Sequence, residues 1–267
     1  MIPGDLAPGT WGSPFLVVAV FLFGLVIGSF VNVLIHRLPR GESVVFPGSH
    51  CPSCGAPIRA YDNVPVLSWL VLRGRCRDCR ARIAVRYPAI ELANGILWVA
   101  VLLRAPGWGD FASGAFLCSA CLALLVIDAE FRILPDRITL TGIAAGIALS
   151  FFSRMRTPLS SIAGAALGAG GLYLLAWTWE KLRKVEAMGL GDVKMLGMIG
   201  ALLGTSGVVL TVLLASVAGS LVGLVLVLAK RGSLQTALPF GVFLALGAIA
   251  SFFWGPILIE LYRSGWR

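Results

Sequence analysis

Two aspartates stand at the ends of long apolar runs, where a charged side chain is costly and needs a reason. Asp192 lies in the string Met188-Gly-Leu-Gly-Asp-Val-Lys194 at the start of one run, and Asp128 ends another run 64 residues earlier. Two carboxylates that share a proton can hydrolyse a peptide bond, because the ionised one takes a proton from water while the protonated one donates to the scissile carbonyl. We therefore predict a catalytic pair, without separate acid and base roles, since the titration belongs to the pair.

Two glycines beside Asp192 are consistent with a peptide-binding role. Gly189 and Gly191 have no side chain to block a backbone, so an extended peptide could approach the carboxylate. Lys194 either tunes the pair or extends its ammonium to the membrane interface, and we group it with the glycines as a candidate substrate-binding residue. A Gly-x-Gly-Asp string is short, and the alternative that Asp192 caps a helix stays open at this point.

A third aspartate is an alternative member of the pair. Asp136 follows Pro135 and precedes another apolar run. That setting is typical of a helix N-cap, and we favour this structural role over catalysis for Asp136.

Four cysteines form two Cys-x-x-Cys pairs separated by 21 residues: Cys51 with Cys54, and Cys76 with Cys79. Thiolates at this spacing predict a closed, tetrahedral zinc site with a structural role. The alternatives are two disulfides or free thiols, and a cytoplasmic location disfavours disulfides. His50 could also be a ligand, although four cysteines already suffice. A segment of this size would lack a sufficient core without the metal.

The composition places these groups in a membrane protein. Of the 267 residues 58% are hydrophobic and 13% charged, which is too apolar for a soluble domain, and apolar stretches long enough to cross a bilayer recur along the chain. The net charge of +9 does not point to nucleic acid, because the basic residues cluster in loops between the apolar stretches.

The apolar stretches predict an all-α polytopic fold with about eight transmembrane helices. The first span is retained rather than cleaved, with its N-terminus outside, because it is full-length and lacks a basic start. We divide the chain into this first span at 1–35, a cytoplasmic four-cysteine zinc-binding domain at 36–86 that holds nine Arg, and a seven-span peptidase domain at 87–267. The seven further spans are predicted at 87–104, 110–129, 137–153, 158–180, 191–204, 206–229 and 238–262, with a tight turn at Gly204-Thr-Ser-Gly207.

Basic residues set the predicted orientation. Eight spans with an outside N-terminus put 17 Lys and Arg residues on the inner side and five on the outer side. Cytoplasmic loops carry such an excess, so the count supports this orientation. It predicts that Asp128 and Asp192 both lie at the cytoplasmic face.

Together the motifs resemble those of the bacterial type IV prepilin peptidases, almost from end to end of the chain. Each motif is weak alone, but their order on eight spans is specific. The matching strings are Gly28-Ser-Phe-Val-Asn-Val-Leu-Ile-His-Arg-Leu-Pro39, both cysteine pairs, Arg86-Tyr-Pro-Ala-Ile-Glu-Leu92, Asp128 with Leu134-Pro-Asp136, and Gly189-Leu-Gly-Asp-Val-Lys194.

The resemblance implies an aspartic endopeptidase of the Gly-x-Gly-Asp class in the bacterial inner membrane. Such enzymes cut the basic leader of prepilins and pseudopilins after a glycine, and the family's catalytic pair falls on Asp128 and Asp192. Many members then methylate the new N-terminal amine with S-adenosylmethionine. The methyl-donor site rests on the resemblance alone.

Three other interpretations compete with this one. A proton-coupled transporter would carry acids near span centres and would have related halves, neither of which is visible. A zinc-bearing membrane scaffold would have no chemistry at either aspartate. A peptidase without methyltransferase activity is the closest alternative.

Overall fold

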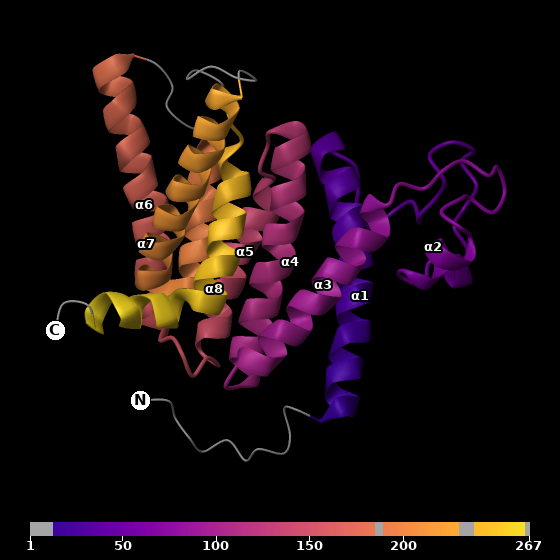
Figure 1. Ribbon diagram of the computed structural model, residues 1–267, viewed down its shortest axis with the longest axis horizontal. Coiled ribbons are helices and arrows are strands. Elements are labelled where there is room, and N and C mark those ends of the chain that lie inside the picture. The colour runs from indigo at the N-terminus through magenta and orange to yellow at the C-terminus, as the bar shows by residue number, and fades with distance from the viewer. Residues whose placement is uncertain (1–12, 185–188, 230–237, 265–267) are drawn as a thin grey trace. The chain divides into compact units, whose positions relative to one another are not determined.

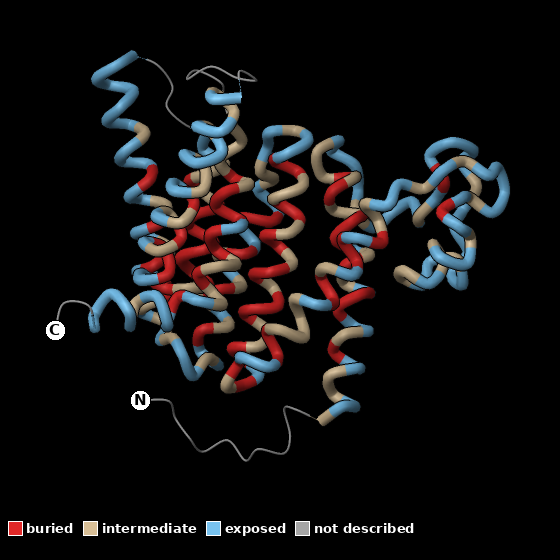
Figure 2. The backbone as a smooth tube through the Cα atoms, in the orientation of Figure 1, coloured by how far each residue is buried: buried red, intermediate tan, exposed pale blue. Residues whose placement is uncertain are grey.

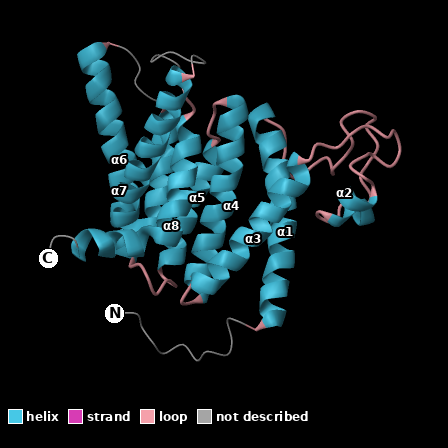
Figure 3. Ribbon diagram, in the orientation of Figure 1, coloured by secondary structure: helices cyan, strands magenta, loops and turns pink. Residues whose placement is uncertain are grey.

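The computed structural model describes residues 13–184, 189–229 and 238–264, and every regular element within them is a helix (Figure 3). The predicted all-α fold is confirmed for these residues. The chain divides into two compact units, one ending at Arg104 and the other beginning at Ala105. In chain order the helices are α1 (Pro14–Arg37), η1 (Leu38–Arg40), η2 (Ala60–Asp62), α2 (Leu67–Val71), α3 (Arg86–Arg104), α4 (Trp108–Phe131), α5 (Asp136–Ser150), α6 (Pro158–Arg183), α7 (Leu190–Leu228) and α8 (Phe240–Ser264).

The first unit is built on an antiparallel pair of helices, α1 and α3 (Figure 1). Gly24 of α1 lies against Gly95 of α3, and Gly28 lies against Glu91, so ascending positions on one helix meet descending positions on the other. A Cβ placed on Gly28 would come within 2.7 Å of the Glu91 Cα. The glycines therefore allow the close backbone approach by which membrane helices associate.

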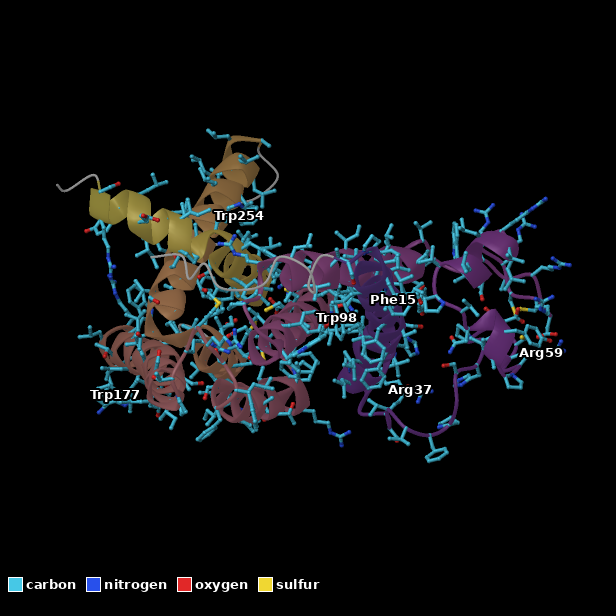
Figure 4. The ribbon with its side chains drawn as sticks, turned by 90° about the horizontal axis from the view of Figure 1, so that it is seen from below. Phe15, Arg37, Arg59, Trp98, Trp177 and Trp254 are labelled. Atoms are coloured by element: carbon cyan, nitrogen blue, oxygen red, sulfur yellow. The ribbon has the colours of Figure 1, made fainter. Side chains whose placement is uncertain are left out.

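Polar side chains tie the same two helices together. The Asn94 amide donates to the Gly24 carbonyl at 2.7 Å, and the Asn32 amide donates to the Tyr87 carbonyl at 3.0 Å. Trp98 lies beside α1, with its ring 5.5 Å from that of Phe23 (Figure 4). Since α1 and α3 are antiparallel, residues 38–85 leave and return at one end of the pair and form the cysteine-bearing domain.

The second unit is organised around α7, which packs against α5, α6 and α8. Its first turns supply some of the most deeply buried side chains, among them Met195 and Ile199 at 0% exposure. Figure 2 shows the buried positions of this unit gathered in α4 and in the neighbouring part of α7. Gly164 of α6 and Gly200 of α7 meet so closely that a Cβ on either would clash with the other's carbonyl oxygen.

The 39 residues of α7 are two arms joined by a turn at Gly204. This residue has φ +75° and ψ −175°, which is not helical and is a conformation that only glycine adopts easily. A Cβ on Gly200 would lie 2.8 Å from Val208 Cγ2, whereas residues eight apart in a straight helix are about 12 Å apart. The chain therefore folds back on itself here, as the Gly204–Gly207 turn predicts.

The turn leaves the last carbonyls of the first arm without helical partners, and Arg156 supplies one. Its guanidinium donates to the carbonyl of Ala201 at 3.0 Å and also to that of Leu202. The Ser161 hydroxyl donates to the Ala201 carbonyl as well. A cation at a helix C-terminus is also favoured by the helix dipole. Partial burial lowers the pKa of the Arg156 guanidinium.

Asp110, in the first turn of α4, organises the loop that carries Arg156. Its buried carboxylate accepts hydrogen bonds from the backbone N–H of Arg154 at 3.0 Å, from that of Met155 at 3.4 Å and from the Ser153 hydroxyl. This acid therefore has a structural role at the end of α4 opposite to Asp128.

Six described helices are long and apolar enough to cross a membrane: α1, α3, α4, α6, α7 and α8. The predicted span at 137–153 corresponds to α5, whose 15 residues extend only about 22 Å. The spans predicted at 191–204 and 206–229 are the two arms of α7. The multi-pass fold is thus confirmed. The count of eight is approximate, because α5 is short and the two arms of α7 count as one among the six long helices.

Candidate active site and metal centre

Asp128 lies in the last turn of α4, where its carboxylate meets the start of α8. The helix ends at Arg132, whose φ of +55° turns the chain and whose N–H donates to the Asp128 carbonyl at 3.0 Å. The Asp128 side chain is buried, and its Oδ2 accepts a hydrogen bond from the Val242 N–H at 3.0 Å. Free N–H groups at a helix start favour a negative charge, so α8 provides a site for this carboxylate.

Gly241 leaves the space that the Asp128 carboxylate fills. A Cβ at this position would lie 2.8 Å from Asp128 Oδ2 and 3.1 Å from Leu134 Cδ1. Local sequence patterns do not reveal this contact, because Gly241 stands 113 residues from Asp128. A Pro-x-Gly string at the start of an apolar run was the available signal.

Asp192 lies in the first turn of α7 and does not cap this helix. The cap position belongs to Gly189, and no side chain forms a capping hydrogen bond there. Asp192 is half-buried and directly follows Gly191, where a Cβ would contact Leu134. Leu134 borders both Gly191 and Gly241, and Gly241 borders the Asp128 carboxylate, so Asp128 and Asp192 lie at adjoining helix ends of α4 and α7.

The two glycines of the Gly-x-Gly-Asp string have different surroundings. Gly189 is exposed, and a Cβ there would meet only the Gly191 nitrogen, at 3.9 Å. A Cβ on Gly191 would lie 3.0 Å from the Leu134 Cβ. Since Leu134 also borders Gly241, this side chain sits between the starts of α7 and α8 beside Asp128.

Asp136 is not the helix cap that we predicted. Pro135 occupies the cap position of α5, Asp136 is the first helical residue, and no side-chain capping bond forms. The carboxylate is instead held by Lys194, whose Nζ lies 2.8 Å from both Asp136 oxygens. The pair joins the starts of α5 and α7. A contact of Lys194 with substrate stays a prediction.

The four predicted metal ligands form one cluster in the first unit. The Sγ atoms of Cys51, Cys54, Cys76 and Cys79 all lie within 4.8 Å of one another, and those of Cys51 and Cys79 are 3.8 Å apart. A tetrahedral zinc site with Zn–S bonds of about 2.3 Å has sulfur–sulfur edges of about 3.8 Å. None of the six cysteines forms a disulfide, so the disulfide alternative is wrong. The cluster fits a metal ion.

Each Cys-x-x-Cys pair forms its own tight turn from backbone hydrogen bonds. The Cys51 N–H donates to the Ala56 carbonyl at 2.9 Å, and the Cys76 N–H donates to the Ala81 carbonyl at 2.8 Å. Both turns end on a residue with positive φ, Gly55 at +72° and Arg80 at +61°. Backbone hydrogen bonds from Ser53 and Cys54 lower the pKa of the Cys51 thiol.

An ion pair holds the second turn against the rest of the domain. Arg77 donates to both oxygens of Asp62 at 2.6–2.7 Å and lowers the pKa of that carboxyl. The fork geometry of the guanidinium makes this a specific contact. It links η2 to the second cysteine pair.

Comparison with known proteins matches both units. The family described as "Bacterial Peptidase A24 N-terminal domain" matches residues 22–105, and the one described as "Type IV leader peptidase family" matches residues 115–224. No solved structure was found to match the chain.

Several bacterial relatives carry the name "Prepilin leader peptidase/N-methyltransferase". The relative from Burkholderia pseudomallei (strain K96243) is 38% identical over 88% of this chain and 84% of its own length. Those from Aeromonas hydrophila and Pseudomonas putida are 37% and 35% identical, over 95% and 94% of this chain and 96% and 93% of their own lengths.

Proposed function

The chain belongs to the type IV leader peptidase family, and from that premise we propose that it removes the leader peptide of type IV prepilins and pseudopilins as an aspartic endopeptidase. The observation that supports the proposal is that Asp128 and Asp192, from two different helices, lie at adjoining helix ends around Leu134 in a partly buried site.

The proposed reaction uses water as the nucleophile. The ionised carboxylate of the pair accepts a proton from water as the oxygen attacks the scissile carbonyl, and the protonated carboxylate donates to the carbonyl oxygen. The tetrahedral intermediate then expels the amine, which takes up a proton from the pair. The Val242 N–H holds the Asp128 carboxylate in place during these transfers. Gly189, Gly191 and Lys194 are the proposed contacts for the substrate backbone.

We place this site at the cytoplasmic face of the bacterial inner membrane, with the N-terminus outside. The support is the distribution of Lys and Arg over the loops. A basic leader would stay in the cytoplasm while the apolar helix of a prepilin sits in the bilayer, so the bond to be cut would lie at the membrane edge.

We further propose that Cys51, Cys54, Cys76 and Cys79 bind one structural zinc ion. The support is the separation of their sulfur atoms and the absence of any disulfide between them. A closed four-thiolate site leaves no open coordination position, so the ion would stabilise the domain and take no part in hydrolysis.

The second proposed activity is methylation of the new N-terminal residue with S-adenosylmethionine as methyl donor. It rests on the names of the relatives, which include N-methyltransferase. A peptidase that lacks this activity is the alternative.

One assay tests both activities. The purified protein is incubated with a prepilin and labelled S-adenosylmethionine, and the product is sequenced from its N-terminus. We expect a cleaved product that carries label, and a cleaved product without label would identify a peptidase alone. Asp192→Asn should slow cleavage by about a hundredfold or more, as removal of a general acid–base group does. Exposed Glu180 gives the matched control, Glu180→Gln, which should cleave normally. Normal cleavage by Asp192→Asn would refute the proposal.

A further inference from the structure

The short helix α2 has an apolar face that no part of its own domain covers. Leu67, Leu70 and Val71 are 60%, 57% and 76% exposed, and their spacing places them on one side of the helix. Three large apolar side chains side by side on a polar, cysteine-bearing domain call for a partner.

The opposite side of α2 is firmly attached to the domain. The Trp69 indole N–H donates to the Ile83 carbonyl at 3.1 Å, and its ring covers Gly74, where a Cβ would come within 2.8 Å. The Ser68 hydroxyl donates to the Tyr61 carbonyl at 3.1 Å. The direction of the apolar face is therefore fixed by the fold.

The start of α2 is also fixed against a membrane helix. The Val66 N–H donates to Glu91 Oε2 of α3 at 2.8 Å. Glu91 lies five residues from the α3 start at Arg86, or about 7.5 Å along the helix axis. Figure 1 shows α2 level with the first turns of α3 and not beyond its end.

The length of α3 relates this level to the bilayer. Its 19 residues extend about 28 Å, which is close to the thickness of the hydrocarbon core, so both ends lie near the core boundaries. A helix held about 5–8 Å inside the boundary sits where interfacial amphipathic helices lie. The loop around α2 is basic, with nine Arg against three acidic residues over 36–86, which suits anionic headgroups.

We propose that α2 is an interfacial anchor, with Leu67, Leu70 and Val71 inserted among the lipid chains of the leaflet that faces the cysteine-bearing domain. The Val66–Glu91 hydrogen bond sets its depth, and the arginines that follow, Arg73 and Arg75, lie at headgroup level. The domain is then held flat against the bilayer at a third point besides α1 and α3. This inference does not depend on the proposed peptidase activity.

Depth measurement by electron paramagnetic resonance tests the proposal. A spin-labelled unnatural amino acid replaces Val71 in the full chain, which leaves the six cysteines in place, and the protein is reconstituted in vesicles of phosphatidylethanolamine and phosphatidylglycerol. The matched control carries the label at Arg59, an exposed residue that Figure 4 places at the end of the domain farthest from α1. Relaxation by oxygen, which concentrates in lipid, is compared with relaxation by a water-soluble nickel chelate.

We expect the ratio of oxygen to nickel accessibility to be several-fold higher at position 71 than at position 59. An equal ratio at the two positions, with nickel reaching both, would overturn the proposal by showing that α2 faces water. Low accessibility to both reagents at position 71 would overturn it too, because a protein surface would then cover the apolar face. A label at Leu70 repeats the measurement if the Val71 variant does not fold.

Discussion

The two candidate centres of this protein are assembled in opposite ways. The cysteine cluster is local, since two turns closed by their own backbone hydrogen bonds supply all four sulfur atoms. The aspartate site is non-local: it needs the end of α4, the start of α7 and the start of α8, with Val242 standing 114 residues from Asp128. A local site depends on a ligand to hold its turns together, whereas a non-local site depends on the packing of long helices.

Loss of the metal should have the largest effect on stability, and it should affect the cysteine cluster and not the aspartate site. A Cys51→Ser, Cys76→Ser double variant is expected to bind no zinc, which removes about 10 kcal/mol of binding free energy from the fold of the domain. In hydrogen exchange, the backbone amides at positions 51 and 76 should lose protection, while the amides of α4 and α7 should keep theirs. Unchanged protection in the cysteine-bearing domain, or a loss throughout the chain, would break the contrast between the two centres.

A single methyl group should damage the aspartate site. Gly241→Ala places a Cβ 2.8 Å from Asp128 Oδ2, so the carboxylate must move, and misplacement of a reacting group by about 1 Å can cost a hundredfold in rate. We expect kcat for prepilin cleavage to fall at least tenfold. Gly219→Ala is the matched control, because a Cβ there meets its nearest neighbour at an ordinary 3.5 Å. Equal rates for the two variants would contradict the geometry.

The contribution of Arg156 to stability should be measurable, because this side chain caps the end of the first arm of α7. Arg156→Met removes this donor from the carbonyls of Ala201 and Leu202. The Ser161 hydroxyl still donates to Ala201, so the loss falls on the Leu202 carbonyl, and a buried unpaired acceptor costs about 1–3 kcal/mol. The melting temperature of the purified protein should fall by several degrees. Arg154→Met is the control, since that side chain is exposed and makes a long 3.4 Å contact. An unchanged melting temperature for Arg156→Met would show that the first arm needs no such cap.

The smallest effect on stability is expected at the Lys194–Asp136 pair. Both side chains are partly exposed, at 34% and 54%, and surface ion pairs contribute about 0–1 kcal/mol. Lys194→Met should therefore leave the melting temperature nearly unchanged. A higher KM with normal stability would support the proposed contact of Lys194 with substrate, and a large loss of stability would show that the pair is a structural support.

The sequence predicted the local features well. The spacing of the cysteines was sufficient for their cluster, because each turn involves neighbours in the chain. The glycines at 204 and 207 predicted the turn in α7, since a positive φ favours glycine. Apolar runs located the helices, although α5 was too short to be counted as a full span by length alone.

The sequence predicted less of what depends on packing. Asp136 was predicted to be a helix cap because a local pattern cannot reveal its contact with Lys194, which lies 58 residues away in the chain. Gly241 and Arg156 escaped notice for the same reason, since each acts on a helix end that only the folded unit brings near. The pairing of Asp128 with Asp192 was predicted from their positions at the ends of apolar runs, and the resemblance to a family favoured Asp128 over Asp136 as the partner. The structure places the two residues at adjoining helix ends around Leu134.

A double-mutant cycle on the aspartates tests the central claim most directly. Initial rates of prepilin cleavage are measured for Asp128→Asn, Asp192→Asn and the double variant, with thermal stability recorded for each. Residues that share one proton act as a unit, so each single change should remove nearly all activity and the double variant should be no slower than either. Near-normal cleavage by one single variant, or losses that multiply in the double variant, would contradict a shared catalytic role for Asp128 and Asp192.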